Sequence, residues 1–368
     1  MCWSKGVRVS SAELPAAAVA PEPGSRFREE IREQPEALLR LVENESEFAR
    51  VGAEMRERGA TTIRMVGHGS SDNAASYGVY AFGLLPNWTA LRDSISLTVY
   101  YGAELDMSGC TAIALSQSGR TPDVVEYARR AKRRGAYIVA ITNDPSSELA
   151  QVADAVLELR AGPENSVAAT KTYTNQLAAL GLLAAHAAGK GDAFAGELRA
   201  AAGAMPQLIL SVESRVANVA IPFAYAGRMF VVGRGAEFAT AREIALKLLE
   251  TCRIAAEPLT ATDLAHGPVA ALDSLFPVWA IASDDSTLPA VIEAVERARD
   301  AGATIIASGS AADAIPGAQY VLASPSTSPL IAPLLSIVPG QLFAGALARA
   351  RGLDPDTPRG LSKVTLAR

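Results

Sequence analysis

The sequence predicts an α/β protein made of two tandem copies of one domain, each a parallel sheet flanked by helices. Short and almost continuously apolar strand segments alternate with helical patterns, which is typical of parallel sheets buried on both faces. The pattern also recurs within the chain. Residues 66–69 (VGHG) are echoed by residues 232–235 (VGRG), and residues 135–140 by residues 302–307, at nearly the same offset. Such a repeat indicates a duplicated domain.

Composition and charge argue against several classes of function. The chain has 368 residues, 49% of them hydrophobic and 20% charged, which suits a globular protein of about two domains. Its net charge of −5 and its lack of a basic block argue against a nucleic-acid partner. No apolar run reaches the roughly 18 residues that a membrane span needs. The three cysteines and three histidines have no ligand spacing, so we expect no metal or other cofactor, and a cytoplasmic location.

The elements of the first domain follow a lead-in that we expect to be disordered. Residues 1–25 are rich in Ala and Pro, whereas the charged segment after them has the recurring apolar positions of helices. The strands are expected at residues 61–66, 94–99, 111–115, 135–142 and 155–159, with a helix over residues 74–84. The predicted parts of the chain are the lead-in, a first domain with its helical lead (26–200), a second domain (201–351) and a C-terminal tail (352–368).

A turn rich in hydroxyl groups is the first candidate for a ligand site. Residues 116–121 (SQSGRT), called the hydroxyl turn below, separate a buried strand from a helix that Thr121 and Pro122 are well suited to start. Free backbone N–H groups, the positive end of the helix dipole and three hydroxyls make a cradle for a dianion such as phosphate. An ordinary capped turn has the same pattern, so both interpretations stay open here. Residues 67–73 form a second such turn, and both follow strand ends, where ligands of parallel sheets bind.

The second copy differs from the first at the matching turn. Where the first copy has Ser116-Gln117-Ser118, the second has Ser283-Asp284-Asp285. Two carboxylates repel a phosphate. We therefore expect the anion in the first copy alone, and a different contribution from the second.

That contribution is visible in three places. Glu243, Lys247 and Glu250 share one face of a helix that is otherwise apolar, so their charges are expected to be buried and partnered or functional. His266 ends a short helical turn, and Lys363 lies in the polar tail. Taken alone, the three charges fit a solvated salt-bridge row, the histidine a structural residue and the lysine a surface residue.

Together these residues resemble the sugar isomerase (SIS) family in its double-domain form. The resemblance covers the chain from about residue 30 and rests on six motifs in order: residues 69–73 (GSSDN), 116–121 (SQSGRT), 166–171 (SVAATK), 245–250 (ALKLLE), 264–268 (LAHGP) and 358–365 (PRGLSKVT). It implies two tandem SIS domains, each a flavodoxin-like three-layer unit. The isomerase half of glucosamine-6-phosphate synthase and the stand-alone glucosamine-6-phosphate deaminases share this layout. The first and last motifs look more like the deaminases.

The resemblance implies roles for particular residues. The 6-phosphate of a hexosamine 6-phosphate would be held by Ser71, Ser116, Gln117, Ser118 and Thr121. The sugar would also meet Gly69, Ser70, Val167, Ala169 and Ser362. Glu250 would take the C2 proton of the open chain, His266 would assist ring opening, and Lys247 and Lys363 would offset charge that develops on oxygen. Reprotonation at C1 and hydrolysis of the C2 imine would then release ammonia, with no metal or redox cofactor.

Three points stay open at this stage. An acetylated amine would favour loss of the 3-hydroxyl instead, which makes the protein a dehydratase. A sensor of sugar phosphates needs the hydroxyl turn but not Glu250, His266 or the lysines. Ala169 and His68 stand where synthases have a serine and a cysteine, which leaves the sugar undetermined. Because few residues precede the first domain, we expect no glutaminase and therefore ammonia release. The resemblance also implies a homodimer in which His266 completes the partner's site.

Overall fold

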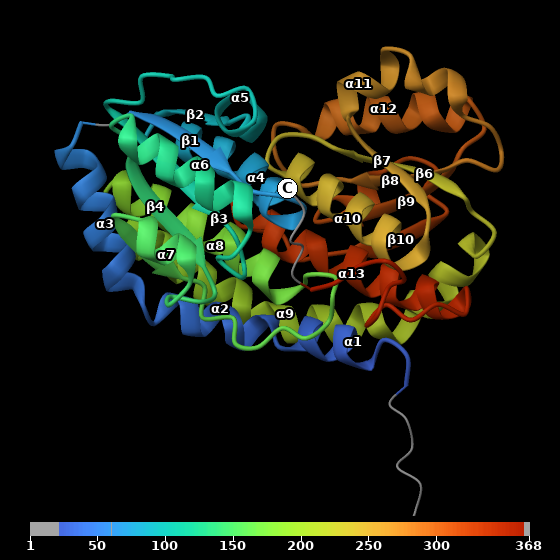
Figure 1. Cartoon of the computed structure of the whole chain (residues 1–368). Coiled ribbons are helices and arrows are strands. Elements are labelled where there is room, and N and C mark those ends of the chain that lie inside the picture. Colours follow the sequence, from blue (N-terminus) through green and yellow to red (C-terminus); the bar gives the residue numbers. More distant parts are fainter. Residues whose placement is uncertain (1–21, 60, 364–368) are drawn as a thin grey trace, which may run out of the picture.

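A computed structural model of the chain describes residues 22–59 and 61–363. Two parallel five-stranded sheets lie side by side with helices on their faces (Figure 1). The first sheet has the order β2-β1-β3-β4-β5, and its strands are β1 (Thr62–Val66), β2 (Thr89–Arg92), β3 (Cys110–Leu115), β4 (Tyr137–Thr142) and β5 (Ala155–Glu158). The second has the order β10-β9-β8-β6-β7, and its strands are β6 (Arg228–Gly233), β7 (Ala255–Thr260), β8 (Pro277–Ile281), β9 (Thr304–Gly309) and β10 (Tyr320–Ala323).

The two orders are one topology read from opposite ends. In each sheet the first strand of the domain lies between the second and the third, which is the flavodoxin-like order. The prediction of a duplicated α/β domain is therefore confirmed. In this order β2 lies on one side of β1 and the later strands lie on the other, and in such sheets ligands bind beyond the carboxyl ends of the two strands at this switch, here β1 and β3. The hydroxyl turn follows β3, and the turn with Ser70 and Ser71 follows β1.

The helices alternate with the strands as the sequence predicts. Those of the lead and the first domain are α1 (Ser25–Arg32), α2 (Gln34–Val42), α3 (Glu45–Glu57), α4 (Ser70–Leu84), α5 (Ile95–Val99), α6 (Pro122–Arg133), α7 (Glu148–Val152) and α8 (Lys171–Ala187). The others are α9 (Gly191–Ala220), α10 (Glu237–Cys252), α11 (Ala261–Ala265), α12 (Leu288–Asp300) and α13 (Ala332–Ala350). Residue 200, where we placed the domain boundary, lies inside α9. The predicted disordered lead-in falls almost entirely on residues 1–21, outside the described residues.

One predicted strand is wrong. Residues 94–99 form a helical turn, because the Ser94 hydroxyl caps α5 by accepting a hydrogen bond from the Leu97 N–H (3.3 Å). The strand that pairs with β1 is β2, which lies just before this turn and had not been identified. Its two end residues are exposed and its two middle residues are only partly buried, so it lacks the buried apolar run that marks the inner strands.

The two domains share one hydrophobic core, in which α10 of the second domain packs against α4 of the first. Polar contacts fix this packing. Arg242 on α10 donates to the Asp72 carboxylate (2.7 Å) and to Ser76 Oγ (2.7 Å) on α4. Tyr173 on α8 donates to the Ala239 carbonyl (3.1 Å). These contacts bring the charged face of α10 to the end of β1, so the site is built from both copies.

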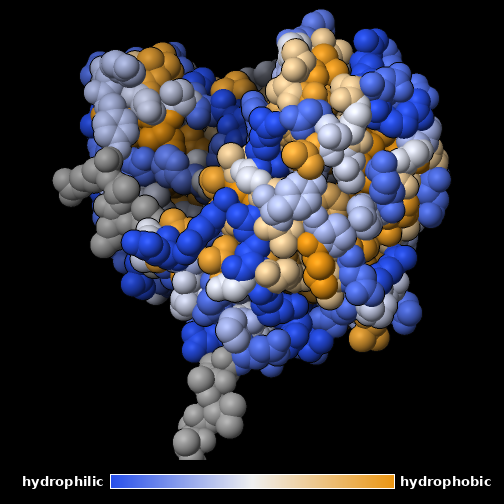
Figure 2. Space-filling view, turned by 90° about the vertical axis from the view of Figure 1, so that its right-hand side faces the viewer, coloured by the Kyte–Doolittle hydropathy of each residue, from blue (hydrophilic) through white to orange (hydrophobic). Residues whose placement is uncertain are grey.

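The outer surface is mixed in character. Figure 2 shows polar and apolar side chains interspersed over the side of the molecule that the second domain forms. Within residues 22–59 and 61–363, no helix is long and apolar enough to cross a bilayer.

Candidate active site

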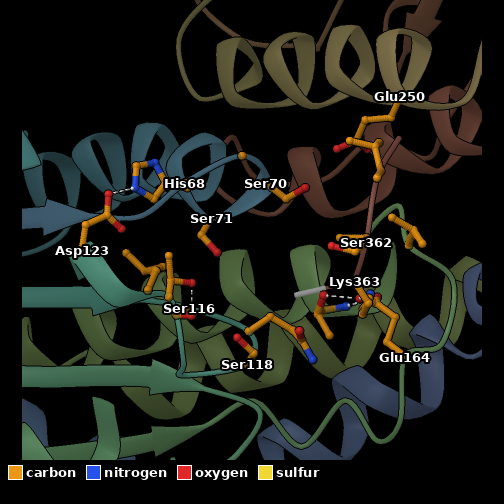
Figure 3. Close-up of a pocket in the computed structure, with 18 residues that line it drawn as sticks. His68, Ser70, Ser71, Ser116, Ser118, Asp123, Glu164, Glu250, Ser362 and Lys363 are labelled. Atoms are coloured by element: carbon orange, nitrogen blue, oxygen red, sulfur yellow. Dashed lines mark hydrogen bonds and ion pairs between the residues drawn. The ribbon is translucent and has the colours of Figure 1, made fainter. Parts of the chain in front are cut away.

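A cavity of about 460 Å³ lies at the carboxyl ends of β1 and β3. This volume suits a small polar metabolite. Figure 3 shows the hydroxyl turn on one side of the cavity and Glu250 on the opposite side. The predicted site residues that line it are Gly69, Ser70, Ser71, Ser116, Gln117, Ser118, Thr121, Val167, Ala169, Glu250, Ser362 and Lys363.

The hydroxyl turn is held in shape by its own side chains. Ser116 Oγ accepts a hydrogen bond from the Gly119 N–H (3.1 Å) and lies 3.0 Å from Thr121 Oγ1. Gly119 has φ +63°, and a β-carbon there would clash with Ser147, so glycine is required. Thr121 stands at the N-cap of α6, but its hydroxyl bonds to Ser116 and caps no helical N–H. The first N–H groups of α6 therefore stay free of side-chain acceptors, as an anion site needs.

The turn after β1 supplies two more hydroxyls in different settings. Ser71 is 8% exposed, and its Oγ accepts a hydrogen bond from Gln176 Nε2 on α8 (2.9 Å). Accepting that bond leaves the Ser71 O–H free to donate into the cavity. Ser70 Oγ instead donates to Glu243 Oε1 on α10 (2.7 Å), which ties the turn to the second domain.

The charged face of α10 is buried, as the sequence predicts. Lys247 and Glu243 are both 0% exposed, and Lys247 Nζ lies 3.2 Å from Glu243 Oε1 and 2.7 Å from Glu250 Oε2. Burial would lower the pKa of Lys247, but the charges of the two glutamates hold it above its usual range. Burial raises the pKa of Glu243, although Lys247 and Asn73 partly offset this. Of the three, Glu250 reaches the cavity, and Lys247 lies behind it.

Lys363 of the tail lines the cavity and is paired there with Glu164, a residue that the sequence analysis missed. Lys363 Nζ lies 2.6 Å from Glu164 Oε2 and donates to the Ser166 carbonyl (2.7 Å). Glu164 is buried and also accepts hydrogen bonds from the N–H groups of Thr170 (2.9 Å) and Thr172 (3.1 Å). Burial would raise its pKa, but the Lys363 charge and these bonds hold it below the usual range. The signal available in the sequence was an acidic residue just before the SVAATK motif.

One predicted catalytic residue stands apart from the cavity, and a pair of residues that was not predicted lines it. His266 is exposed at the end of α11 and does not line it, so one chain by itself leaves this residue away from Glu250. His68 and Asp123 do line the cavity and form an ion pair, which the sequence analysis had not predicted. In the part of the chain that the structure describes, no three His, Cys, Asp or Glu side chains are grouped as a metal site would need.

Comparison with known proteins identifies the family. A family model for the SIS domain matches residues 58–186 and 223–349. The chain belongs to the SIS family. The resemblance seen in the sequence is therefore confirmed, and each of the two sheets belongs to one SIS domain.

Individual relatives refine this placement. The chain is 37% identical over 362 residues to a glutamine–fructose-6-phosphate aminotransferase of Mycolicibacterium smegmatis, with 91% of this chain and 56% of the relative covered. It thus spans little more than half the length of the curated relatives it matches. A Silicibacter pomeroyi protein described as a phosphosugar isomerase is 35% identical, with a TM-score of 0.80 and coverage of 90% of this chain and 99% of that chain. A glucosamine-6-phosphate deaminase of Thermotoga maritima shares the fold, with a TM-score of 0.74 at 22% identity over 92% of this chain and 99% of that chain.

Proposed function

We propose that this SIS protein acts on a hexosamine 6-phosphate resembling glucosamine 6-phosphate, as a deaminase or isomerase that removes the C2 proton. The observation that carries the proposal is that one cavity holds both the hydroxyl turn and the Glu250 carboxylate. A sugar whose phosphate sits at the hydroxyl turn extends across the cavity toward Glu250. Binding energy at the phosphate can then orient the reacting carbons.

Glu250 is the group best placed to act as the base. Its side chain is 22% exposed, so its carboxylate meets both the cavity and the Lys247 ammonium 2.7 Å away. Because Lys247 is fully buried between two glutamates, its proposed role is to position Glu250. Lys363 lines the cavity, so its ammonium is the one available to stabilise charge that develops on a sugar oxygen. Proton return at C1 leaves a C2 imine, whose hydrolysis releases ammonia and a ketose phosphate.

Dehydration of an N-acetylated hexosamine 6-phosphate is the second candidate, and one observation favours it. Ala169 lines the cavity with a methyl group in place of a hydroxyl. This removes a polar contact and leaves room for an acyl group. Removal of the same C2 proton followed by loss of the 3-hydroxyl gives an unsaturated sugar that absorbs ultraviolet light.

One assay separates the candidates. Purified protein is incubated with glucosamine 6-phosphate and, separately, with N-acetylglucosamine 6-phosphate, while ammonia, ketose phosphate and ultraviolet absorbance are followed. Ammonia with ketose phosphate from the first compound supports the deaminase. Absorbance gained from the second supports the dehydratase. If neither compound loses or exchanges its C2 hydrogen, the proposal fails.

The proposal includes a homodimer with shared sites, because His266 lies outside the cavity of its own chain. The apolar side chains Leu249 and Leu361 are 53% and 47% exposed beside Glu250 and Lys363, where a partner would cover them. Mixing inactive Glu250→Gln and His266→Ala subunits should restore up to about a quarter of the wild-type activity, because one site in each heterodimer carries neither change. No recovery after proven subunit exchange would mean that each chain builds its site alone.

A further inference from the structure

His68 and Asp123 form an ion pair on the cavity wall that the proposed mechanism does not use. His68 Nε2 lies 2.7 Å from Asp123 Oδ2, and both residues lie beside the hydroxyl turn (Figure 3). His68 follows β1, whereas Asp123 is in the first turn of α6. The His68 side chain is 55% exposed, so tight packing does not force this contact. The pair therefore joins the two turns that meet at the expected anion site.

Asp123 is an unusual neighbour for an anion. It lies two residues after Thr121, at the helix start whose free N–H groups face the cradle. A carboxylate there repels a bound dianion. Its Oδ1 is buried and accepts no hydrogen bond from the described residues, so the His68 ring is the group that offsets its charge. The charge felt at the hydroxyl turn then depends on whether His68 is protonated.

The remaining charged groups near His68 have partners of their own. On α4, Asp72 is paired with Arg92 and Arg242. The pairs from the other elements around the cavity are Glu243, Lys247 and Glu250 on α10, Glu164 with Lys363, and Arg120 with Asp144. Histidine is the side chain that commonly gains or loses its proton near neutral pH. His68 is the only histidine among the described residues that line the cavity, so its pair with Asp123 is the contact to test for an effect of pH.

We propose that the His68–Asp123 pair makes anion binding at the hydroxyl turn depend on pH, with protonated His68 as the form that binds. When His68 is protonated the pair is neutral, and when it loses its proton the pair carries one negative charge beside the dianion. The affinity for the anion therefore falls as pH rises. We expect a fall of about tenfold, which is typical of one added unit charge close to an anion in a partly solvated site. The inference deepens the proposed function and rests on it only in taking the hydroxyl turn as an anion site.

Inorganic sulfate is the probe, because it stays a dianion throughout the range in which sugar phosphates themselves titrate. Its dissociation constant for the full chain is measured by calorimetry from about pH 6 to about pH 8.5, which spans the usual histidine range. The wild type is expected to bind sulfate about tenfold more weakly at the upper end. No turnover is needed, so the result does not depend on which sugar the protein uses.

Two substitutions separate the partners. His68→Gln leaves Asp123 charged at every pH, so its affinity should be weak and flat. Asp123→Asn removes the negative charge, so at high pH it should bind sulfate about tenfold more tightly than the wild type does. The double variant carries no charge at either position, and its affinity should be flat and close to that of the wild type at low pH. Because His68 is exposed, its replacement should not disturb the fold.

The outcomes are distinct. A flat wild-type profile, or a slope that persists in His68→Gln, overturns the role of the pair while the anion site stands. Weaker binding by Asp123→Asn at high pH also overturns it. That result would mean that the pair matters for holding the turn in shape, and not because the Asp123 carboxylate repels the anion. Failure of the wild type to bind sulfate at any pH overturns the anion site itself, and with it the proposed function.

Discussion

The two halves of the chain place corresponding residues after corresponding strands and then fill the space differently. In the first half, Ser71 and Ser116 line a cavity. In the second half, Ser283 follows β8 as Ser116 follows β3, and Glu237 stands two residues after Gly235 as Ser71 stands two residues after Gly69. The second half thus has a carboxyl group where the first half has a hydroxyl that lines the cavity.

The carboxyl group of Glu237 is enclosed by hydroxyl donors. Glu237 is 2% exposed, and it accepts hydrogen bonds from the hydroxyls of Ser283 (2.6 Å), Ser336 (2.8 Å) and Thr240 (2.7 Å). An acidic side chain of the protein occupies the place that we propose for the substrate phosphate in the first half. The difference teaches that a duplicated site can be closed from within, by filling it with an acidic side chain of the protein itself.

The second half reaches the cavity through α10 instead. The helix that begins with Glu237 carries Lys247 and Glu250 into the cavity region of the first half, where Ser70 and Asn73 hold Glu243 (2.7 Å and 2.8 Å). In the proposed mechanism, one half supplies the anion cradle and the other supplies the base. Each of the following predictions tests this division of work.

The largest effect is expected from Glu250→Gln. If the second half supplies the base, kcat should fall by about 10²- to 10⁴-fold, the usual contribution of general-base catalysis. The decisive measurement is exchange of the C2 hydrogen of the substrate with deuterated water. Glu296→Gln, on the exposed face of α12, is the matched control and should exchange as the wild type does. Wild-type exchange in Glu250→Gln would assign the base to another residue.

A smaller effect on catalysis is expected from changing the serines of the hydroxyl turn, and Ser283 is the position in the second half that corresponds to Ser116. Ser116→Ala combined with Ser118→Ala removes two hydroxyls from the open cradle, and KM should rise by about 10- to 100-fold for lost bonds to a charged group. Ser283→Ala is the matched change in the filled half, and it should leave KM unchanged while lowering the melting temperature, because Glu237 loses a donor. If KM responds to Ser283→Ala as it does to Ser116→Ala, the two halves do not differ as described.

Short-range signals in the sequence, together with the resemblance to the SIS family, predicted this fold and most of the residues that line this site. The strand–turn–helix pattern around residues 116–121 fixes the hydroxyl turn locally, and the burial of Lys247 follows from its apolar neighbours on one helix. The strand order had to be read from the structure, because pairing between distant strands leaves no local mark. The edge strand β2 was missed, and the neighbouring apolar segment at residues 94–99 was predicted as the strand in its place.

The missed residues of the site are those whose partners are distant in the chain. Glu164 meets Lys363 across 199 positions, and Glu237 meets Ser336 across 99. The acidic residue before the SVAATK motif could have drawn attention to Glu164, but nothing in a single sequence shows which distant residue is its partner. The sequence analysis assigned the exclusion of anions from the second half to Asp284 and Asp285. In the structure Asp285 accepts hydrogen bonds from the Thr287 N–H (2.7 Å) and hydroxyl (2.6 Å), so Glu237 is the carboxylate buried among the hydroxyls.

The smallest effect is expected from Glu237→Gln, which changes the buried carboxyl group of the second half and should alter stability. Burial raises the pKa of Glu237, and its three hydroxyl donors offset this only in part. Once pH exceeds 4.5, the ordinary pKa of a glutamate, the unfolded chain has lost the Glu237 proton while the folded protein keeps it. The contribution of Glu237 to the free energy of unfolding therefore falls as pH rises toward the raised pKa. A glutamine side chain at this position cannot ionise, so the Tm of the variant should rise relative to that of the wild type as pH increases above 4.5. Thermal unfolding of both proteins across that range measures it, with Glu296→Gln as the exposed control. A difference in Tm that stays constant with pH would show that Glu237 is ionised in both states, as a fully compensated internal anion would be.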